Sequence, residues 1–342
     1  MSDDCVMAPT AQQPPPGDYA PVCCDENGFT VERARTASHF RNSALIIGES
    51  LIDVVGDARY AGGSPMNVAV GLGRLGRFVE LATWFGRDDD GDLLGKHLKE
   101  SHVKVAAGSD GADHTSTAKV RFDEAGSASY IFDLEWRLPA SFVSDVTAPV
   151  PVVAHTGSIA AALQPGVTDV AVVIERLAAL TTVSFDVNIR PQIIGPLNEV
   201  RPLAERFAGL ANIVKASDED LAWLYPNVSP LVSARRWAAN GPSIVVLTRG
   251  ADGVTAITGR DEIDLPAPTV KVADTVGAGD AFMAGLLHAL WGAGLLGPNG
   301  RAALRGIDET TLRQALDAAT QVAAITLSRP GADPPWASEL TA

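Results

Sequence analysis

The chain has 342 residues, of which 46% are hydrophobic and 20% are charged, and its formal net charge is −14. This composition supplies a buried core and excludes a mostly disordered chain. The acidic excess argues against nucleic acid as a partner, because a protein that binds the phosphate backbone needs an excess of Lys and Arg. The length favours two domains, or one large α/β domain with an insertion.

Residues 1–42 are expected to form a disordered tail, because they contain a Gln- and Pro-rich stretch and show no sustained hydrophobic period. All three cysteines (Cys5, Cys23 and Cys24) lie in this segment, so no disulfide framework supports the rest of the chain. The segment lacks the apolar stretch of a secretory signal, and no run of about 18 apolar residues occurs in the chain. We therefore expect a cytoplasmic protein with no membrane partner.

From Ser43 onward, apolar runs typical of buried strands alternate with stretches of helical periodicity. The strand-like runs cover residues 44–48, 51–55, 79–85, 150–155, 182–187, 211–215 and 243–248. The helix-like stretches cover residues 67–75, 92–100, 168–180, 200–210, 218–224, 233–239, 281–291 and 311–327. This alternation predicts an α/β fold in which a mostly parallel sheet carries helices on both faces.

Residues 115–133 differ from this pattern, because two strand-like runs flank a turn that contains glycine, which is typical of a β-hairpin. Together with residues 51–60, this hairpin is predicted to form a small antiparallel sheet beside the main one. An edge sheet of this kind is suited to be a lid over a binding cleft or the contact surface of a homodimer.

Gly71-Leu-Gly-Arg-Leu-Gly76 has the letter pattern of a dinucleotide-binding loop. That loop must follow a strand and open a helix, whereas this motif ends a helical stretch and precedes a strand. We interpret Gly76 as the residue that ends the helix, and Gly71 and Gly73 as sites of close packing. The motif therefore argues against a nicotinamide-dependent dehydrogenase.

The segment Asp274-Thr-Val-Gly-Ala-Gly-Asp280 carries a stronger signal. Its residues Gly277, Ala278 and Gly279 have minimal side chains and precede an apolar helix, so their backbone amides can face an anion at the helix N-terminus. Asp280 follows in the first turn, where a carboxylate favours the helix dipole or acts as a base on a hydroxyl group. We favour the catalytic interpretation, because a phosphate cradle beside a base forms the centre of a phosphoryl-transfer site.

This segment resembles the C-terminal signature of the ribokinase-like (PfkB-type) carbohydrate kinases, and residues Gly62–Gly76 resemble the N-terminal signature of the same family. The resemblance implies a ribokinase-like three-layer α/β fold over residues 43–335, with a mostly parallel central sheet and a small β-sheet lid near residues 51–60 and 115–133. Residues 336–342 would then be a C-terminal tail. The resemblance also implies that Asp280 is the general base and that residues 277–279 form an anion hole.

The same resemblance implies contacts with the sugar. Asp53, Gly62, Gly63 and Asn67 match sugar-contact positions, and Arg190 is expected to contact the acceptor or the transferred phosphate. Without the resemblance, Gly62 and Gly63 would be a turn ahead of a helix start, and Arg190 would equally well form a structural ion pair.

The nucleotide and the metal ions have their own expected positions. Asp220 is expected to position Mg²⁺ through water, although the family usually has Asn and Glu where this chain has Ser217 and Asp220. The local alternative, a Ser cap followed by acidic residues in the first helical turn, is compatible with that role. Asp274 and the carbonyl of Val276 match a monovalent-cation site for K⁺, although Pro335 stands where a polar residue is expected. The residues expected to bind the nucleotide are Lys215, Ser217, Thr248, Gly250 and Gly253.

The resemblance therefore implies a sugar kinase that depends on ATP and Mg²⁺ and takes a small-molecule sugar. A fructose-type sugar is favoured, because Gly48-Glu-Ser-Leu-Ile-Asp53 and the following Gly62-Gly-Ser-Pro-Met-Asn67 resemble fructokinases most. Alternative acceptors within the family are 2-keto-3-deoxygluconate, ribose and nucleosides. The alternative of another class is a sensor that binds sugar or nucleotide without catalysis, which the complete Gly-Ala-Gly-Asp set argues against.

Overall fold

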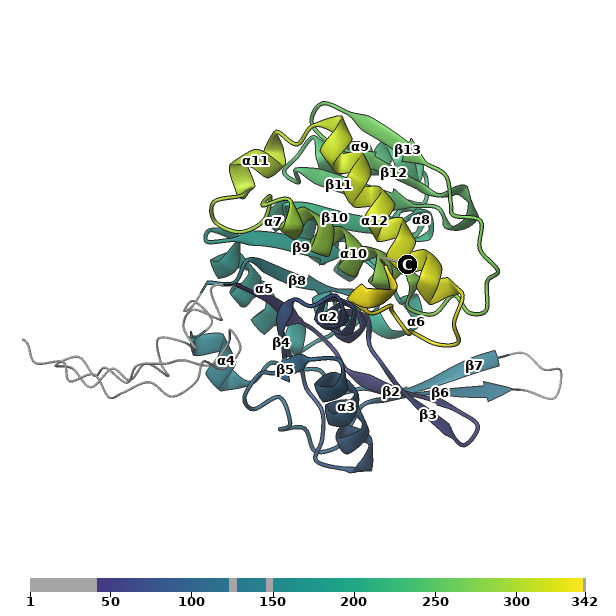
Figure 1. Ribbon diagram of the computed structural model, residues 1–342. Helices are drawn as coiled ribbons and strands as arrows, with labels where there is room; N and C mark the ends of the chain where they lie inside the picture. The colour runs from purple at the N-terminus through teal and green to yellow at the C-terminus, as the bar shows by residue number, and fades with distance from the viewer. Residues whose placement is uncertain (1–41, 123–127, 146–149, 341–342) are drawn as a thin grey trace, which may run out of the picture. The chain divides into compact units, whose positions relative to one another are not determined.

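The structure, a computed structural model, describes residues 42–122, 128–145 and 150–340 (Figure 1). Residues 1–41 of the predicted tail, with the three cysteines, lie outside the described residues. The turn of the predicted hairpin, residues 123–127, lies outside them as well.

The main sheet confirms the predicted α/β class. Its strands are β1 (Ser43–Ile47), β4 (Phe78–Ala82), β5 (Val103–Val105), β8 (Val153–Gly157), β9 (Thr182–Asp186), β10 (Ile213–Ser217), β11 (Ile244–Thr248), β12 (Val254–Ile257) and β13 (Glu262–Leu265). Their order is β13-β12-β11-β10-β9-β8-β1-β4-β5. All neighbours from β11 to β5 pair in parallel, and β12 and β13 extend the sheet as an antiparallel hairpin. Strands β5, β12 and β13 were not predicted from the sequence, because strands of three or four residues are too short to show a period.

Helices cover both faces of this sheet (Figure 1). The helices are α2 (Ser64–Arg74), α3 (Asp89–Glu100), α4 (Ala140–Asp145), α5 (Gly166–Ala178), α6 (Pro191–Ile194), α7 (Leu197–Leu210), α8 (Asp218–Leu224), α9 (Pro230–Ala238), α10 (Ala278–Gly292), α11 (Arg301–Arg305) and α12 (Glu309–Leu327). Ile46 and Ile213 pack in a core with α2, α10 and α12. The next residues, Ile47 and Val214, point to the other face and pack with α5, α7, α8 and α9.

The small sheet lies beside α3 and contains β2 (Leu51–Val55), β3 (Ala58–Gly62), β6 (Thr117–Phe122) and β7 (Ala128–Asp133), in the order β3-β2-β6-β7. The prediction that it is antiparallel is wrong for its central pair, because β2 and β6 run in parallel. A long crossover through α2, β4, α3 and β5 separates these two strands, and a crossover of that length permits parallel pairing. The pairs β2–β3 and β6–β7 are antiparallel, as expected of hairpins.

The glycines of the letter pattern at residues 71–76 serve packing, as predicted. A Cβ on Gly71 would lie 2.7 Å from the Cβ of Ala284 on α10, and one on Gly73 would lie 2.2 Å from the carbonyl oxygen of Ser101. Gly76 follows the end of α2 with φ 81°, the left-handed conformation of a helix terminator. Close contact between α2 and α10 brings together the two predicted signature segments, because one (Gly62–Gly76) spans α2 and the other (Asp274–Asp280) leads into the start of α10.

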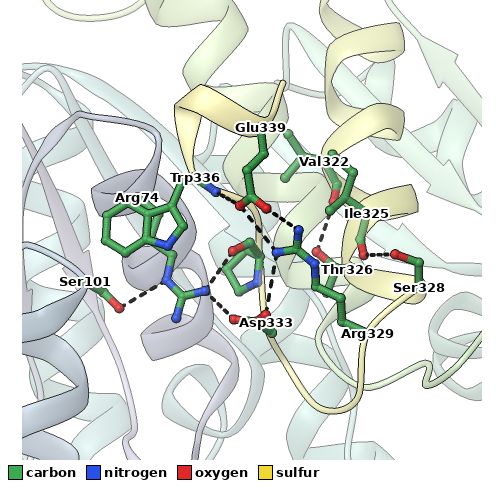
Figure 2. A network of polar contacts seen from close by, with 11 residues as sticks. Arg74, Ser101, Val322, Ile325, Thr326, Ser328, Arg329, Asp333, Trp336 and Glu339 are labelled. Atoms are coloured by element: carbon green, nitrogen blue, oxygen red, sulfur yellow. Dashed lines mark hydrogen bonds and ion pairs between the residues drawn. The ribbon is translucent and has the colours of Figure 1, made fainter. Parts of the chain in front are cut away.

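Residues 329–340, here called the C-terminal strap, return along α12 to α2 (Figure 2). The guanidinium group of Arg329 pairs with the carboxylate of Glu339, which also accepts a hydrogen bond of 2.7 Å from the backbone N–H of Trp336. Arg74 on α2 pairs with Asp333 and lies over the Trp336 ring, 5.4 Å from its centroid. The structure thus differs from the predicted tail at 336–342, because residues 336–340 are bonded to the domain. A charged segment of this kind lacks the hydrophobic period that would reveal its packing in a sequence.

Among the described helices, none combines the length and the apolar character that crossing a membrane requires.

Candidate active site

The predicted site residues gather at the carboxyl edge of the main sheet. The segments that follow the parallel strands β1, β8, β9, β10 and β11 all leave the sheet at this edge, which is where open α/β sheets bind ligands. Two of these segments have unusual backbone conformations, with φ 54° at Ser158 after β8 and φ 38° at Asn188 after β9. Positive φ is uncommon for residues other than glycine and concentrates at functional sites.

The turn at residues 277–279 opens α10, and within it the N–H of Ala278 donates a long hydrogen bond of 3.4 Å to the carbonyl oxygen of Thr275. Gly277 is the N-cap residue with φ 73°, and no described side chain caps this helix end. A Cβ on Gly277 would lie 2.5 Å from the Cβ of Ala332, and one on Gly279 would lie 3.2 Å from Nζ of Lys215. Small residues are therefore required here, and the helix dipole together with the amides favours an anion.

Asp280 is the third residue of α10 and is only 6% exposed. The hydroxyl of Ser64 donates a hydrogen bond of 2.7 Å to its Oδ1, and the side-chain amide of Asn67 donates one of 2.8 Å to its Oδ2. Burial raises the pKa of Asp280, while these two hydrogen bonds and the charges of Lys215 and Arg190 oppose that rise. The structure thus brings Asn67, a predicted sugar contact, directly against the predicted base.

Lys215, a predicted nucleotide contact, lies in the same cluster. Its side chain is 6% exposed, and its Nζ lies 3.0 Å from Oδ2 of the fully buried Asp186. Burial alone would lower the pKa of Lys215, but the negative charges of Asp186, Asp280 and Asp220 outweigh it and raise the pKa. The lysine therefore carries its charge behind the 277–279 turn.

Asp53 on β2 lies against the glycine pair that precedes α2. A Cβ on Gly62 would lie 2.4 Å from Oδ2 of Asp53, and one on Gly63, where φ is 115°, would lie 2.5 Å from the carbonyl oxygen of Glu49. Burial raises the pKa of Asp53 to about 6, and the charge of Arg190 opposes the rise. Because Arg190 also acts on Asp280, it lies within electrostatic reach of both predicted carboxylates.

Asp220 uses both carboxylate oxygens on the backbone. Oδ1 accepts a hydrogen bond of 2.7 Å from the N–H of Ile189, and Oδ2 accepts one of 2.8 Å from the N–H of Ser217. The Ser217 hydroxyl in turn accepts a hydrogen bond of 3.0 Å from the N–H of Asp220, which completes a capping box at the start of α8. The local alternative for this segment is confirmed, and a metal ion could reach Asp220 only through its remaining lone pairs or a water molecule.

The predicted nucleotide contacts Ser217 and Thr248 pair at the ends of β10 and β11. The loop that follows contains Gly250 with φ 53° and Gly253 with φ 84°. A Cβ on Gly253 would lie 2.0 Å from the carbonyl oxygen of Leu265, so only glycine fits this turn. These residues form one side of the sheet edge, where Ser217 ends the strand that also carries Lys215.

Asp274 joins the loop before α10 to the C-terminal strap. Its Oδ1 accepts a hydrogen bond of 3.0 Å from the N–H of Val276, and its Oδ2 accepts one of 2.8 Å from the N–H of Gly331. These hydrogen bonds hold the pKa of Asp274 below its ordinary value. The described residues contain no group of three or more His, Cys, Asp or Glu side chains arranged around a common metal position. The roles of Asp274 and Val276 toward a monovalent cation stay predictions.

Two residues of this cluster, Ser64 and Glu49, were not predicted from the sequence. A contact between Ser64 and the site could have been inferred only from its three-residue spacing from Asn67, which places both residues on one face of the helix. Glu49 is buried, accepts a hydrogen bond of 3.0 Å from the N–H of Ala160, and has its pKa raised to about 7, mainly by burial. His155 on β8 is buried, with its Nδ1 2.9 Å from the hydroxyl oxygen of Ser184. Burial lowers its pKa to about 3, so it is a neutral core residue.

Known proteins share this fold and this sequence pattern. A fructokinase from Rhizobium leguminosarum bv. trifolii is 33% identical over 288 residues, which cover 80% of this chain and 86% of the relative. The crystal structure of a fructokinase with bound ATP from Xylella fastidiosa has a TM-score of 0.75 and 25% identity, with 88% of this chain and 97% of that chain covered. The crystal structure of a fructokinase from Vibrio cholerae O395 in its fructose, ADP and calcium ion bound form has a TM-score of 0.68 and 26% identity. The match covers 85% of this chain and 94% of that chain.

The sequence model of one family, described as "pfkB family carbohydrate kinase", matches residues 41–339, which is nearly the whole described part of the chain. The protein therefore belongs to the PfkB family of carbohydrate kinases.

Proposed function

We propose that this protein is an ATP-dependent fructokinase, which transfers the γ-phosphoryl group of ATP to a hydroxyl group of fructose or a similar sugar. The observation that carries the proposal is the position of Asp280, a buried carboxylate held by two hydrogen bonds directly after the small-residue turn of α10. Family membership gives the reaction class, and the names of the similar fructokinases support the sugar.

In this reaction Asp280 is the general base. It accepts the proton of the sugar hydroxyl as that oxygen forms a bond to the γ-phosphorus and the bond from phosphorus to the bridging oxygen of ADP breaks. The amides of residues 277–279 hydrogen-bond the oxygens of the transferred group, whose charge they stabilise. Since positioning and charge stabilisation supply most of the rate in phosphoryl transfer, a rigid turn and a fixed base are suited to this chemistry.

The sugar is proposed to lie between the small sheet and the start of α2. Asp53 and the carbonyl group of Asn67 offer acceptors to sugar hydroxyls, and Gly62 and Gly63 allow the ring to approach the backbone. Arg190 lies within reach of the charges of Asp53 and Asp280, which supports a contact with the acceptor or with the transferred phosphate. The nucleotide phosphates then extend from the 277–279 turn toward Lys215, Ser217, Thr248 and the glycine loop after β11.

Mg²⁺ is the proposed metal cofactor, and when bound to ATP it neutralises phosphate charge. In kinase sites this ion keeps several waters and needs few protein carboxylates, which fits the already hydrogen-bonded Asp220. A monovalent cation such as K⁺ is proposed near Asp274 and Val276. The hydrogen bonds that Asp274 accepts from the N–H groups of Val276 and Gly331 support a role of this loop in holding the 277–279 turn.

The small sheet is proposed as a lid that excludes water from the reaction, and as the surface of a homodimer. Three large apolar side chains on its strands support the second role, since Val55, Tyr60 and Ile131 are 42%, 56% and 40% exposed. The cytoplasmic location stays a prediction.

A panel of acceptors tests the function. ADP release from ATP would be measured with fructose, other hexoses, pentoses, 2-keto-3-deoxygluconate and nucleosides, each with Mg²⁺ and with and without K⁺. The proposal expects the highest kcat/KM with fructose. A higher kcat/KM with any other acceptor would reassign the substrate, and binding of sugar without any ADP release would make the protein a sensor.

A further inference from the structure

We propose that Ser64 is a positioning residue for the general base, which it keeps ionised and correctly oriented through the hydrogen bond to Asp280. This inference rests on the proposed function and adds a residue that neither signature assigns. Ser64 acts through Asp280 and is not proposed to touch the sugar.

The geometry gives each carboxylate oxygen of Asp280 one donor. Ser64 donates to Oδ1 at 2.7 Å and Asn67 donates to Oδ2 at 2.8 Å, so the plane of the carboxylate is fixed before any substrate binds. Each oxygen keeps a second lone pair, which is free to accept the proton of the sugar hydroxyl. Both donors prefer the ionised carboxylate, and hydrogen bonds to a charged group are the stronger kind.

The backbone places Ser64 for this contact. Gly63, with φ 115°, ends the connection from β3 and packs against the carbonyl of Glu49, so Ser64 becomes the first residue of α2. Asn67 is three residues further on and lies on the same face of the helix. Ser64 is 8% exposed, and its hydroxyl faces a residue that is 216 positions away in the chain. Gly63 occupies the N-cap position of α2, so Ser64 is not the capping residue, and its hydroxyl bonds to Asp280 outside the helix.

The charged groups around Asp280 make the hydrogen bond important. Lys215 on β10 and Arg190 after β9 favour its ionised form, whereas Asp186 on β9 and Glu49 after β1 bring negative charge toward it. Burial also disfavours ionisation. Removing the Ser64 hydroxyl leaves these opposing effects in place, so the base would lose protons only at a higher pH.

The test compares S64A with the wild type in the pH dependence of kcat for fructose phosphorylation. Loss of one hydrogen bond to a charged group is expected to move the acidic limb up by about one pH unit and to lower kcat about tenfold at pH values below that limb. KM for fructose is expected to change less than about threefold, because the hydroxyl does not bind the sugar. The conservative variant S64T, which keeps the hydroxyl, should return the limb toward its original position.

S233A is the matched control, because Ser233 on α9 is also buried, at 2% exposure, and its hydroxyl has no hydrogen-bond partner among the described residues. Its pH profile should equal that of the wild type. S64C, which keeps most of the side-chain volume but donates weakly, replaces S64A if that variant does not fold. An unmoved acidic limb in S64A or S64C would overturn the proposal, and so would a higher KM with unchanged kcat.

A second measurement separates this inference from the proposed function. The carboxyl carbon of Asp280 would be titrated by ¹³C NMR in the ligand-free wild type, S64A and S233A, with D280N used to assign its signal. The pKa should rise in S64A only. If the wild type phosphorylates no sugar, the proposed function fails, and this titration still decides whether Ser64 controls the carboxylate.

Discussion

The ammonium group of Lys215 lies 3.0 Å from the carboxylate of Asp186, and both side chains are almost completely removed from solvent. Lys215 is the only lysine or arginine among the buried residues of the described chain, whereas three buried carboxylates (Asp186, Asp220 and Asp280) act on its charge. Lys215 and the more exposed Arg190 therefore offset part of the negative charge of this centre.

Removal of the Lys215 charge is expected to destabilise the fold strongly. K215M leaves Asp186 buried without its partner, which costs about 3–5 kcal/mol in similar cases. The free energy of unfolding would be measured by urea denaturation, with K104M as the control. Lys104 is 59% exposed in its pair with Glu80, so that loss should cost less than about 1 kcal/mol. The double variant K215M/D186N should recover part of the stability, and an equal cost in single and double variants would refute the coupling.

The conformation of Gly277 is expected to be essential for activity. In G277A the new Cβ would lie 2.5 Å from the Cβ of Ala332, in a backbone conformation with φ 73°. The turn would shift, and kcat should fall by about a hundredfold or more, as when an oxyanion-hole donor is lost. G294A controls for backbone strain alone, because Gly294 has φ 72° and no atom within 4 Å of the added Cβ. Equal kinetics in both variants would show that the turn tolerates displacement.

Asp53 is expected to give sugar binding a pH dependence. Its pKa is raised to about 6, so the carboxylate that accepts sugar hydroxyls is present above that pH and is lost below it. KM for the sugar should rise as the pH falls through about 6, and in D53N it should be high at every pH. Protonation of Asp53 is expected to weaken sugar binding, but it has the opposite effect on the free energy of unfolding. The folded state binds this proton more tightly than the unfolded chain does, so the contribution of Asp53 to stability increases as pH falls from about 6 toward 4. A KM that does not vary between pH 5 and 8 would contradict the assignment of Asp53.

The C-terminal strap is expected to support the turn at residues 277–279. Arg74 fastens the strap to α2 (Figure 2). The strap reaches the turn through the hydrogen bond from the N–H of Gly331 to Asp274 and through the contact that Ala332 makes at Gly277. R74A should therefore speed hydrogen exchange at residues 274–279 and lower kcat/KM for ATP about tenfold, the effect expected of a small displacement of positioning groups.

R313A serves as the control for R74A, because Arg313 pairs with Glu309 on the exposed surface of α12. It should leave the exchange at residues 274–279 and kcat/KM for ATP as they are in the wild type. If R74A behaves like R313A, the strap does not support the turn.

Local sequence signals sufficed for part of this structure. Six strands of the main sheet (β1, β4, β8, β9, β10 and β11) lie in largely apolar runs, and the alternation of these runs with amphipathic stretches predicts the α/β class. The small-residue turn and the carboxylate that follows it could also be predicted, because Gly277 to Asp280 are consecutive and lie at a single helix N-terminus.

Long-range relations could not be predicted from the sequence. Ser64 and Asp280 are 216 residues apart, and only the packing of α2 on α10 brings them together. The pairing of Lys215 with Asp186 depends on the register of β9 and β10, which no pattern within either strand specifies. Two further features could not be predicted for the same reason. They are the parallel pairing of β2 with β6 and the packing of the C-terminal strap, which both result from contacts between segments distant in the chain.

The most direct test of the whole account is the rate of ADP release with fructose and ATP in D280N compared with the wild type and with D317N, in which an exposed residue of α12 carries the same substitution. General-base catalysis predicts that D280N loses about a thousandfold in kcat while it still binds ATP, and that D317N equals the wild type. Turnover by D280N at the rate of the wild type would contradict the assignment of Asp280 as the base.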